Sequence, residues 1–117
     1  MSKSRLGQEG EARAAALLES RGIKIIARNF RSQWGEIDLI AAEGETLAFI
    51  EVKTWNYYGY GELEYGINSK KRRRIIETAK YFLSVHREYN GMALRFDVIF
   101  IAPDKISHLP GAFMEQI

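Results

Sequence analysis

The sequence predicts one α/β domain, spanning residues 1–117, in which a mixed β-sheet is flanked by helices. A chain of 117 residues fits a single domain. Two segments with the apolar spacing of amphipathic helices alternate with runs of strand-like residues, in the order α-β-β-β-α-β, with one more strand expected at the C-terminus. Because a helix carries the chain to the last long strand, that strand should lie parallel to a neighbour.

The first half of the chain predicts a helix and three strands. Residues 4–21 are Ala-rich and amphipathic, and Gly22 stands in the usual position just past a helix C-terminus. The second and third strands should form a hairpin, with Gly44 in its turn. The three strands are expected over 23–30, 34–42 and 46–55.

The second half predicts a loop, a helix and two strands. Residues 56–68 mix Tyr, Gly and acids, which is typical of a loop whose rings either stack on bases or pack against the domain. Asn68 or Ser69 can cap a second helix that runs to about Glu88. The remaining strands are expected over 92–101 and 105–113.

Composition excludes several classes of site. The chain has no Cys, so disulfides and thiolate zinc sites are excluded. The two histidines, His86 and His108, are isolated and are expected at the surface, which argues against a His-based metal site or triad. A metal here would therefore be a hard cation bound by oxygen. The sequence lacks an apolar run of about 20 residues and a signal peptide, so a cytoplasmic protein is expected.

Basic and acidic residues are concentrated in different segments of the chain. The net charge is only +2, but residues 70–74 read KKRRR while acids gather at 36–51. Like charges at a helix start oppose the helix dipole, and a bound phosphate would relieve that cost. The alternative is a solvated helix start. The residues expected to bind nucleic-acid phosphates are Lys70, Lys71, Arg72, Arg73 and Arg74.

The hairpin places acids inside its most apolar runs. If residues 44–45 form a two-residue turn, Asp38 lies opposite Glu51 and Glu36 opposite Lys53. Facing carboxylates repel one another at about 5 Å between Cβ atoms. Three arrangements would offset that repulsion, namely a shared proton, screening by Lys53, or a bridging divalent cation.

The cation gives the pair a chemical role. Asp38, Glu51 and the backbone carbonyl of Val52 would supply oxygens to Mg²⁺ or Mn²⁺. Lys53 would orient a water molecule or stabilise phosphorane charge, and its alternative is an ion pair with Glu36.

Glu11 is the other acid in an apolar setting. Its spacing places it on the helix face of Ala14, Ala15 and Leu18, which indicates a further metal ligand or a partner of one. The alternative is an acid that the dipole favours near a helix start. Further along the chain, Arg95 and Asp97 alternate with apolar residues in a strand, and a structural contact of Asp97 is favoured there.

Several of these residues also form a longer pattern. Asp38 followed by Glu51-Val52-Lys53 is similar to the PD-(D/E)xK signature of restriction-endonuclease-like nucleases. The chain as a whole resembles the YraN-like family of small bacterial proteins, which is reminiscent of Holliday-junction resolvases. The residues that carry this resemblance are Gly10-Glu11, Arg28 to Arg31, Gly35 to Ile40, Phe49 to Lys53, Lys71 and Arg95 to Val98.

The resemblance implies a restriction-endonuclease-like core, a metal-dependent nuclease site and a nucleic-acid substrate. It places Lys71 near the scissile phosphate, and in resolvase-like nucleases an N-terminal helix supplies an acid such as Glu11. Two positions depart from the pattern of related nucleases. Ile37 stands where Pro often precedes the first acid, and Trp55 stands where a basic residue is frequent.

Together these observations predict a Mg²⁺- or Mn²⁺-dependent endonuclease acting on structured or branched DNA. The expected catalytic residues are Glu11, Asp38, Glu51 and Lys53. A homodimer is expected by analogy with resolvases, since two symmetric cuts need two sites. The alternatives are a non-catalytic nucleic-acid-binding module and a partner-binding protein whose carboxylate pair is structural.

Overall fold

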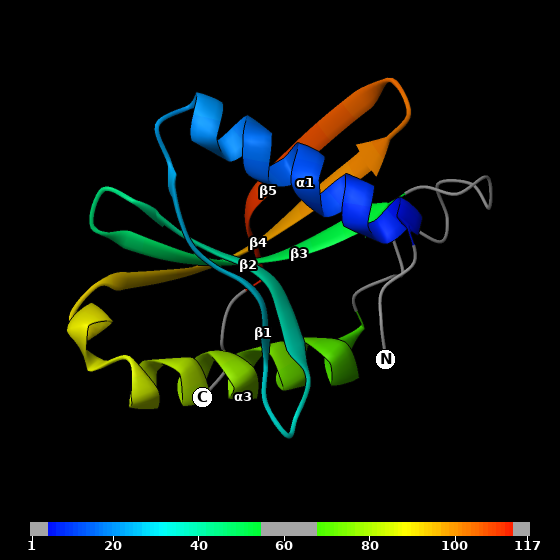
Figure 1. The fold of residues 1–117 in the computed structure, drawn as a ribbon. Helices are drawn as coiled ribbons and strands as arrows, with labels where there is room; N and C mark the ends of the chain where they lie inside the picture. The colour runs from blue at the N-terminus through cyan, green and yellow to red at the C-terminus, as the bar shows by residue number, and fades with distance from the viewer. Residues whose placement is uncertain (1–4, 55–67, 114–117) are drawn as a thin grey trace.

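A computed structural model gives the fold of the protein and describes residues 5–54 and 68–113 (Figure 1). Its helices are α1 (Arg5–Ser20) and α3 (Ser69–Val85), and a 3₁₀ turn, η1 (Arg87–Tyr89), follows α3. Its strands are β1 (Lys24–Arg31), β2 (Glu36–Glu43), β3 (Thr46–Thr54), β4 (Ala93–Ala102) and β5 (Lys105–Phe113). The predicted Tyr-rich loop, apart from Asn68, and Trp55 lie outside the described residues.

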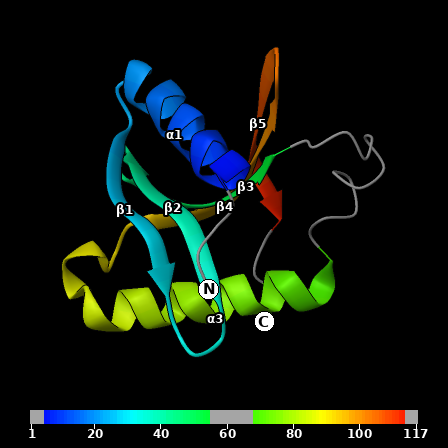
Figure 2. The same ribbon diagram turned by 45° about the vertical axis from the view of Figure 1, so that its right-hand side comes forward.

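The strands form one mixed sheet in the order β1-β2-β3-β4-β5. Neighbours are antiparallel except β3 and β4, which are parallel because α3 lies between them in the chain. The α1 and α3 helices cover opposite faces of the sheet (Figures 1 and 2). The predicted α/β class and element order are confirmed, and so is the parallel pairing of the strand that follows the second helix, β4, with its neighbour β3. The architecture is consistent with an endonuclease-like core.

Each face of the sheet has its own apolar core. Along β3, Ala48 and Ile50 pack in the core under α1, whereas Leu47 and Phe49 pack in the core under α3. Because side chains alternate along a strand, Glu51 continues the series that faces α3. The sequence therefore directs an acid toward the helix that begins with the basic run.

The predicted element bounds need small corrections. The expected strand 34–42 begins at Glu36, because the preceding residues form the turn between β1 and β2. The second helix ends at Val85 instead of Glu88, where the 3₁₀ turn takes over. Asn68 is its N-cap, and the Asn68 side-chain oxygen accepts a hydrogen bond from the Lys71 N–H at 2.9 Å. Among the described residues, no helix is long and apolar enough to cross a membrane.

Candidate functional site

The β2–β3 hairpin has the predicted register. Pairs run from Glu43–Thr46 to Leu39–Ile50, which makes residues 44–45 the two-residue turn. Gly44 adopts the left-handed conformation (φ 59°) that such a turn requires. Beyond the last of these pairs, the Val52 N–H donates to Asp38 Oδ2 at 2.7 Å. Asp38 is thus held against β3 at the position that the register sets opposite Glu51.

Three carboxylates from two elements, one of them that of Asp38, lie close together. Glu11 from α1 and Glu36 and Asp38 from β2 each place an oxygen within 4.8 Å of the other two. Glu11 is 8% exposed and Asp38 4% exposed. Close acids in poorly solvated positions repel one another and offer an all-oxygen ligand set, which suits a hard divalent cation. The structure thus brings together two of the predicted metal ligands and adds Glu36.

Glu36 was not predicted from the sequence as a ligand. The hairpin register suggested Lys53 as its partner, whereas in the structure Glu36 Oε2 lies 3.0 Å from Arg31 Nε. The signal that could have revealed it is the two-residue spacing of Glu36 and Asp38, which puts both side chains on one strand face.

Asn29 was not predicted either. It lies on β1 between Arg28, paired with Leu39, and Phe30, paired with Ile37, so the register sets it opposite Asp38. In the amide orientation that satisfies its surroundings, Asn29 Nδ2 donates to Glu36 Oε1 at 2.8 Å and to Glu11 Oε1 at 3.0 Å. Its backbone is left-handed (φ 52°), a conformation that Asn tolerates better than most residues. Asn29 therefore bridges the two elements that supply the acids.

Gly10 explains how α1 comes so close to the sheet. A Cβ atom at this position would collide with Oγ1 of Thr54, at the end of β3. A glycine allows the first half of α1 to approach the strand, and Glu11 follows it directly in the chain. In the Gly10-Glu11 pair, the glycine therefore allows the close packing that brings the acid to the sheet.

Glu51 contacts lysines from two elements. Lys71 Nζ, at the start of α3, lies 2.8 Å from Glu51 Oε1, and Lys53 Nζ lies 3.5 Å from the same oxygen. Screening of both acids by Lys53 was one of the three arrangements expected for the facing pair. The structure places Lys53, and more closely Lys71, against Glu51.

The charges of this group affect one another. Burial raises the pKa of Glu51 above its ordinary value, and the Asp38 carboxylate raises it further, against the partial opposition of Lys71 and Lys53. Burial lowers the pKa of Lys53, and Lys71 adds to that effect. Burial also disfavours charge on Lys71, but its interactions with Glu51, Lys53 and Asp38 together outweigh burial, so the pKa of Lys71 is raised. Lys71 therefore stays cationic, while Lys53 gives up its proton more readily.

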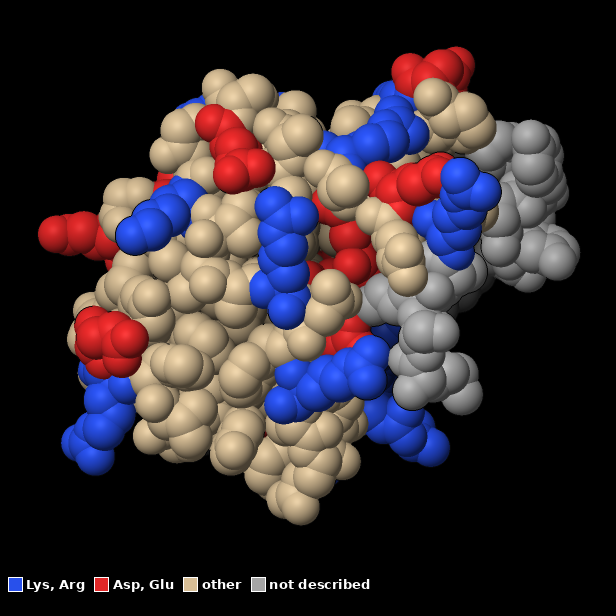
Figure 3. Space-filling view, in the orientation of Figure 1, with Lys and Arg blue, Asp and Glu red and all other residues tan. Residues whose placement is uncertain are grey.

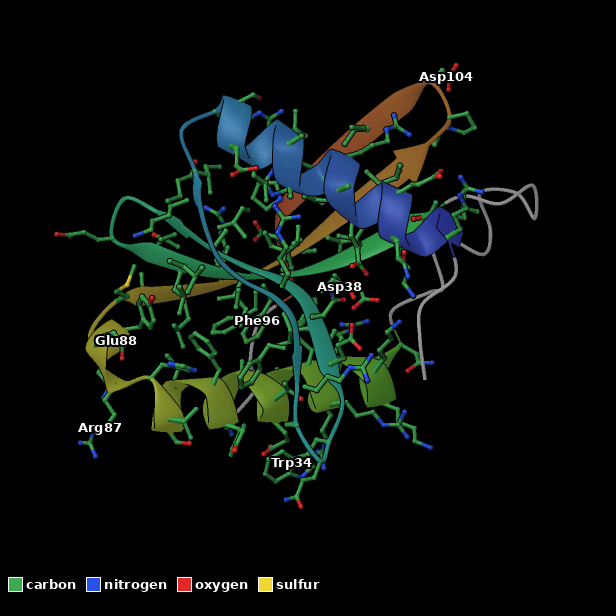
Figure 4. All side chains as sticks on the ribbon, viewed as in Figure 1. Trp34, Asp38, Arg87, Glu88, Phe96 and Asp104 are labelled. Atoms are coloured by element: carbon green, nitrogen blue, oxygen red, sulfur yellow. The ribbon has the colours of Figure 1, made fainter. Side chains whose placement is uncertain are left out.

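A cleft of about 460 Å³ opens at this group. Its lining residues are Trp34, Gly35, Glu36, Asp38, Glu51, Asn68, Lys70, Lys71, Arg74 and Ile75. Figure 3 shows the same arrangement from outside, with acidic atoms recessed in a hollow and Lys and Arg side chains around it. Figure 4 shows Asp38 in the gap between α1 and α3. Only part of the predicted basic run therefore lines the cleft, namely Lys70, Lys71 and Arg74. Arg72 and Arg73 are exposed on α3 and do not line it.

The backbone of Val52, whose carbonyl is a predicted metal ligand, is directed toward β2. In a β-strand the N–H and C=O of one residue point toward the same neighbouring strand. The Val52 N–H points to Asp38, so its carbonyl is directed to the same side of β3. The backbone of Val52 therefore faces the acidic group.

A second charged network lies away from the cleft and is structural. Arg95 binds Asp97 through two hydrogen bonds of 2.9 and 3.0 Å, and the Gly111 N–H also donates to Asp97. The expected structural contact of Asp97 is confirmed. His108 Nε2 lies 2.9 Å from Asp97 Oδ2 and its side chain is 8% exposed, so the expectation of a surface histidine was wrong. His86 is half-buried and packs on Phe82, with ring centroids 4.4 Å apart, which corrects the other expectation.

Fold and site together define an α/β protein with a recessed acidic centre that basic side chains border. Residues 10–101 match the model of "Uncharacterised protein family UPF0102", and the chain belongs to this family, which is the YraN-like family that its motifs resemble. It is 46% identical to a UPF0102 protein of Treponema pallidum (strain Nichols), over 96% of this chain and 94% of the relative. It is 43% identical to one of Persephonella marina, over 92% and 91% of the two chains.

Proposed function

We propose that this protein is a divalent-metal-dependent endonuclease that acts on structured or branched DNA. The observation that carries the proposal is the meeting of Glu11, Glu36 and Asp38 within 4.8 Å. The neighbouring Glu51, Lys53 and Lys71 lie in the same part of the fold and add the remaining parts of a phosphodiesterase site. Acids that lie this close together beside an open cleft are the arrangement expected where a divalent cation binds.

The donor set fits Mg²⁺ or Mn²⁺. Asp38 and Glu36 would hold the cation with Glu11, and Glu51 with the Val52 carbonyl would complete the protein ligands. When bound, the cation would supply Lewis-acid stabilisation of the phosphate charge and make a bound water more acidic.

The two lysines have different roles in this proposal. Lys53, whose pKa is lowered, orients the attacking water and accepts its proton. The water oxygen bonds to phosphorus, the ester P–O bond breaks, and the leaving oxygen takes up a proton from solvent. Lys71, whose pKa is raised, remains cationic and neutralises charge on the phosphate.

The exposed cations hold the DNA backbone. Lys70 and Arg74 line the cleft, and Arg72 and Arg73 extend the positive surface along the same turns of α3. Contacts of this kind bind phosphates without reading sequence and weaken as salt is raised. A homodimer would present two such centres to the two strands of a branched substrate. Sedimentation with and without a four-way junction measures the oligomeric state.

The experiment titrates Mn²⁺ into wild type and Asp38→Asn by calorimetry, alongside cleavage of linear, flapped and four-way DNA. The expected result is saturable binding that the substitution abolishes, with cleavage of a branched substrate by wild type alone. Glu43→Gln, an acid at the far end of β2, is the matched control and should leave both properties unchanged. Cleavage that persists in Asp38→Asn would contradict the assignment of the centre.

The alternative proposal is a non-catalytic nucleic-acid-binding module. The basic surface of α3 supports it, because that surface needs no metal to bind phosphates. DNA binding by wild type without Mn²⁺ binding or cleavage would favour this module. Absence of all three activities would leave a partner-binding protein with structural acids.

A further inference from the structure

Trp34 is an aromatic side chain exposed at the mouth of the cleft. It lies at the tip of the β1–β2 hairpin, beside α3 (Figure 4), and is 41% exposed. Its ring lies 6.3 Å from that of Tyr81 on α3, which is 42% exposed. Tyr81 in turn lies 6.0 Å from the ring of Phe30. The three rings form a continuous aromatic surface, of which Trp34 is the part that reaches the cleft.

The backbone that carries Trp34 is fixed. The Ser32 N–H donates to the Gly35 carbonyl at 2.8 Å, and the Trp34 N–H donates to Ser32 Oγ at 3.1 Å. Ser32 Oγ also lies 2.7 Å from Oγ1 of Thr78, a fully buried residue of α3. The turn is thus tied to the helix, so the backbone that carries the indole is positioned before any ligand arrives. A group on a preorganised backbone loses less conformational entropy on binding.

The position of Trp34 relative to the acids suggests which ligand it meets. Asp38 is the fourth residue after Trp34 in the chain, which is at most about 13 Å along an extended strand. The same cleft is lined by Lys70 and Arg74, which offer cations for phosphates, and by carboxylates that could hold a metal ion. A nucleotide next to the scissile one would therefore reach Trp34 with its base.

The charge of the surroundings distinguishes Trp34 from other exposed apolar residues. Leu6, Val85, Leu94 and Leu109 are exposed to a similar degree but do not line the cleft. Single exposed apolar side chains are ordinary on protein surfaces. An indole that shares a cleft with two cations is complementary to a nucleotide, which presents an aromatic face and a negative charge together.

We infer that Trp34, backed by Tyr81, is a stacking site for an unpaired DNA base adjacent to the phosphate bound in the cleft. The inference rests on the proposed nuclease function and adds a substrate class to it. A base inside a duplex has both faces covered, so the site selects DNA with a single-stranded segment, such as a flap or a junction with open bases.

The experiment measures binding without cleavage, in EDTA. Labelled single-stranded DNA, a duplex of the same sequence, and a single strand of abasic nucleotides are titrated with wild type, Trp34→Ala and Leu109→Ala, and read by anisotropy. Stacking is sequence-tolerant and is removed with the ring, so Trp34→Ala should weaken binding of the normal single strand roughly 5- to 100-fold. Binding of the duplex and of the abasic strand should change less than about 2-fold, because phosphate contacts dominate there.

A second readout reports on the ring itself. The sequence has two tryptophans, so Trp55→Phe leaves Trp34 as the sole indole. Its fluorescence should be quenched by the normal single strand and not by the abasic strand. Trp34→Phe, which keeps an aromatic face, should retain most of the affinity that Trp34→Ala loses.

The outcomes separate this inference from the proposed function. Equal binding of single-stranded DNA by wild type and Trp34→Ala, with duplex binding and metal-dependent cleavage intact, would overturn the stacking site and leave the nuclease. No binding of any DNA in EDTA, together with no cleavage in Mn²⁺, would overturn both. A change of sedimentation in Trp34→Ala without a change of DNA affinity would show that the ring covers a second copy of the chain, which also overturns the inference.

Discussion

Lys71 Nζ lies 2.8 Å from Glu51 Oε1, closer than Lys53 Nζ, at 3.5 Å, although Lys53 is only two residues from Glu51 in the chain. The N-cap of α3 explains this, because Asn68 fixes the first turn through the Lys71 N–H. The start of α3, which carries the basic run, is therefore also bonded into the acidic centre.

Lys71→Met should reduce cleavage far more than Lys70→Met, its neighbour in the same run. Loss of the Lys71 ammonium leaves Glu51 with one weaker cationic partner and removes a charge beside the phosphate. Because Lys71 is partly exposed and solvent screens the pair, the free energy of unfolding should fall by only about 1 kcal/mol. Chemical denaturation and single-turnover cleavage separate the two effects. Equal cleavage by the two variants would contradict a role for Lys71 beyond binding.

The raised pKa of Glu51 predicts opposite pH dependences for stability and for metal binding. A carboxyl group whose pKa is higher in the folded state favours folding while protonated, and that contribution is lost as pH rises through the folded pKa. The metal-free protein should therefore lose stability from about pH 4 upward, through this group, while Mn²⁺ affinity rises because the cation needs the ionised form.

Denaturation and calorimetry across that pH range, in wild type and Glu51→Gln, measure both trends. The substitution should flatten the stability profile and weaken Mn²⁺ binding at every pH. A stability profile that is the same in both proteins would mean that Glu51 does not titrate in this range.

Mn²⁺ should stabilise the fold by linkage. A ligand that binds only the folded state stabilises it by about 2.7 kcal/mol at 100 times its Kd. Asp38→Asn keeps an oxygen that can accept the Val52 N–H but removes one of three repelling charges. The metal-free variant should thus be at least as stable as wild type and should gain nothing from Mn²⁺. Thermal denaturation with and without Mn²⁺ tests this, and an equal metal-induced rise in Tm would contradict it.

The sequence determined the parts of the site that lie on one hairpin. Gly44 and Glu45 set the turn, and the turn set the register, so the relation of Asp38 to Glu51 could be predicted from the residues alone. Contacts between elements could not be predicted in the same way. The distance of Glu11 from Glu36 depends on how closely α1 packs, and the contact of Lys71 with Glu51 depends on where α3 begins.

Two polar residues were misjudged for the same reason. His108 is isolated from other histidines in the sequence and is expected at the surface, but its ring bonds to Asp97 on the adjacent strand. Asn29 looks like an ordinary strand residue, and only the approach of α1 gives its amide two carboxylates to bond. Side chains that connect elements carry no local signal, because their partners are distant in the chain.

Gly10→Ala should move Glu11 away from the acidic group. The added methyl collides with the Thr54 hydroxyl, and overpacking of this kind costs about 1–3 kcal/mol, against a gain in helix propensity of about 0.5–1 kcal/mol. The variant should be less stable and should bind Mn²⁺ more weakly. Thr54→Ala added to it should restore part of both losses, since the two residues are in contact. Additive losses in the double variant would show that the collision is not the cause.

Asn29→Ala should weaken Mn²⁺ binding by the acidic group without removing a carboxylate. Glu11 and Glu36 each lose a hydrogen-bond donor, and the exposed position of Asn29 limits the cost in unfolding free energy to about 1 kcal/mol. Asn29→Gly is the matched control, because it also lacks the amide but accepts the left-handed backbone (φ 52°) without strain.

If the amide positions the acids, both Asn29 variants should bind Mn²⁺ more weakly than wild type, and Asn29→Ala should be the less stable of the two. Calorimetry gives the affinities and denaturation gives the stabilities. Wild-type Mn²⁺ affinity in Asn29→Gly would show that this residue matters only for its backbone. The acids would then be held in place by the packing of α1 on β3, at Gly10 and Thr54.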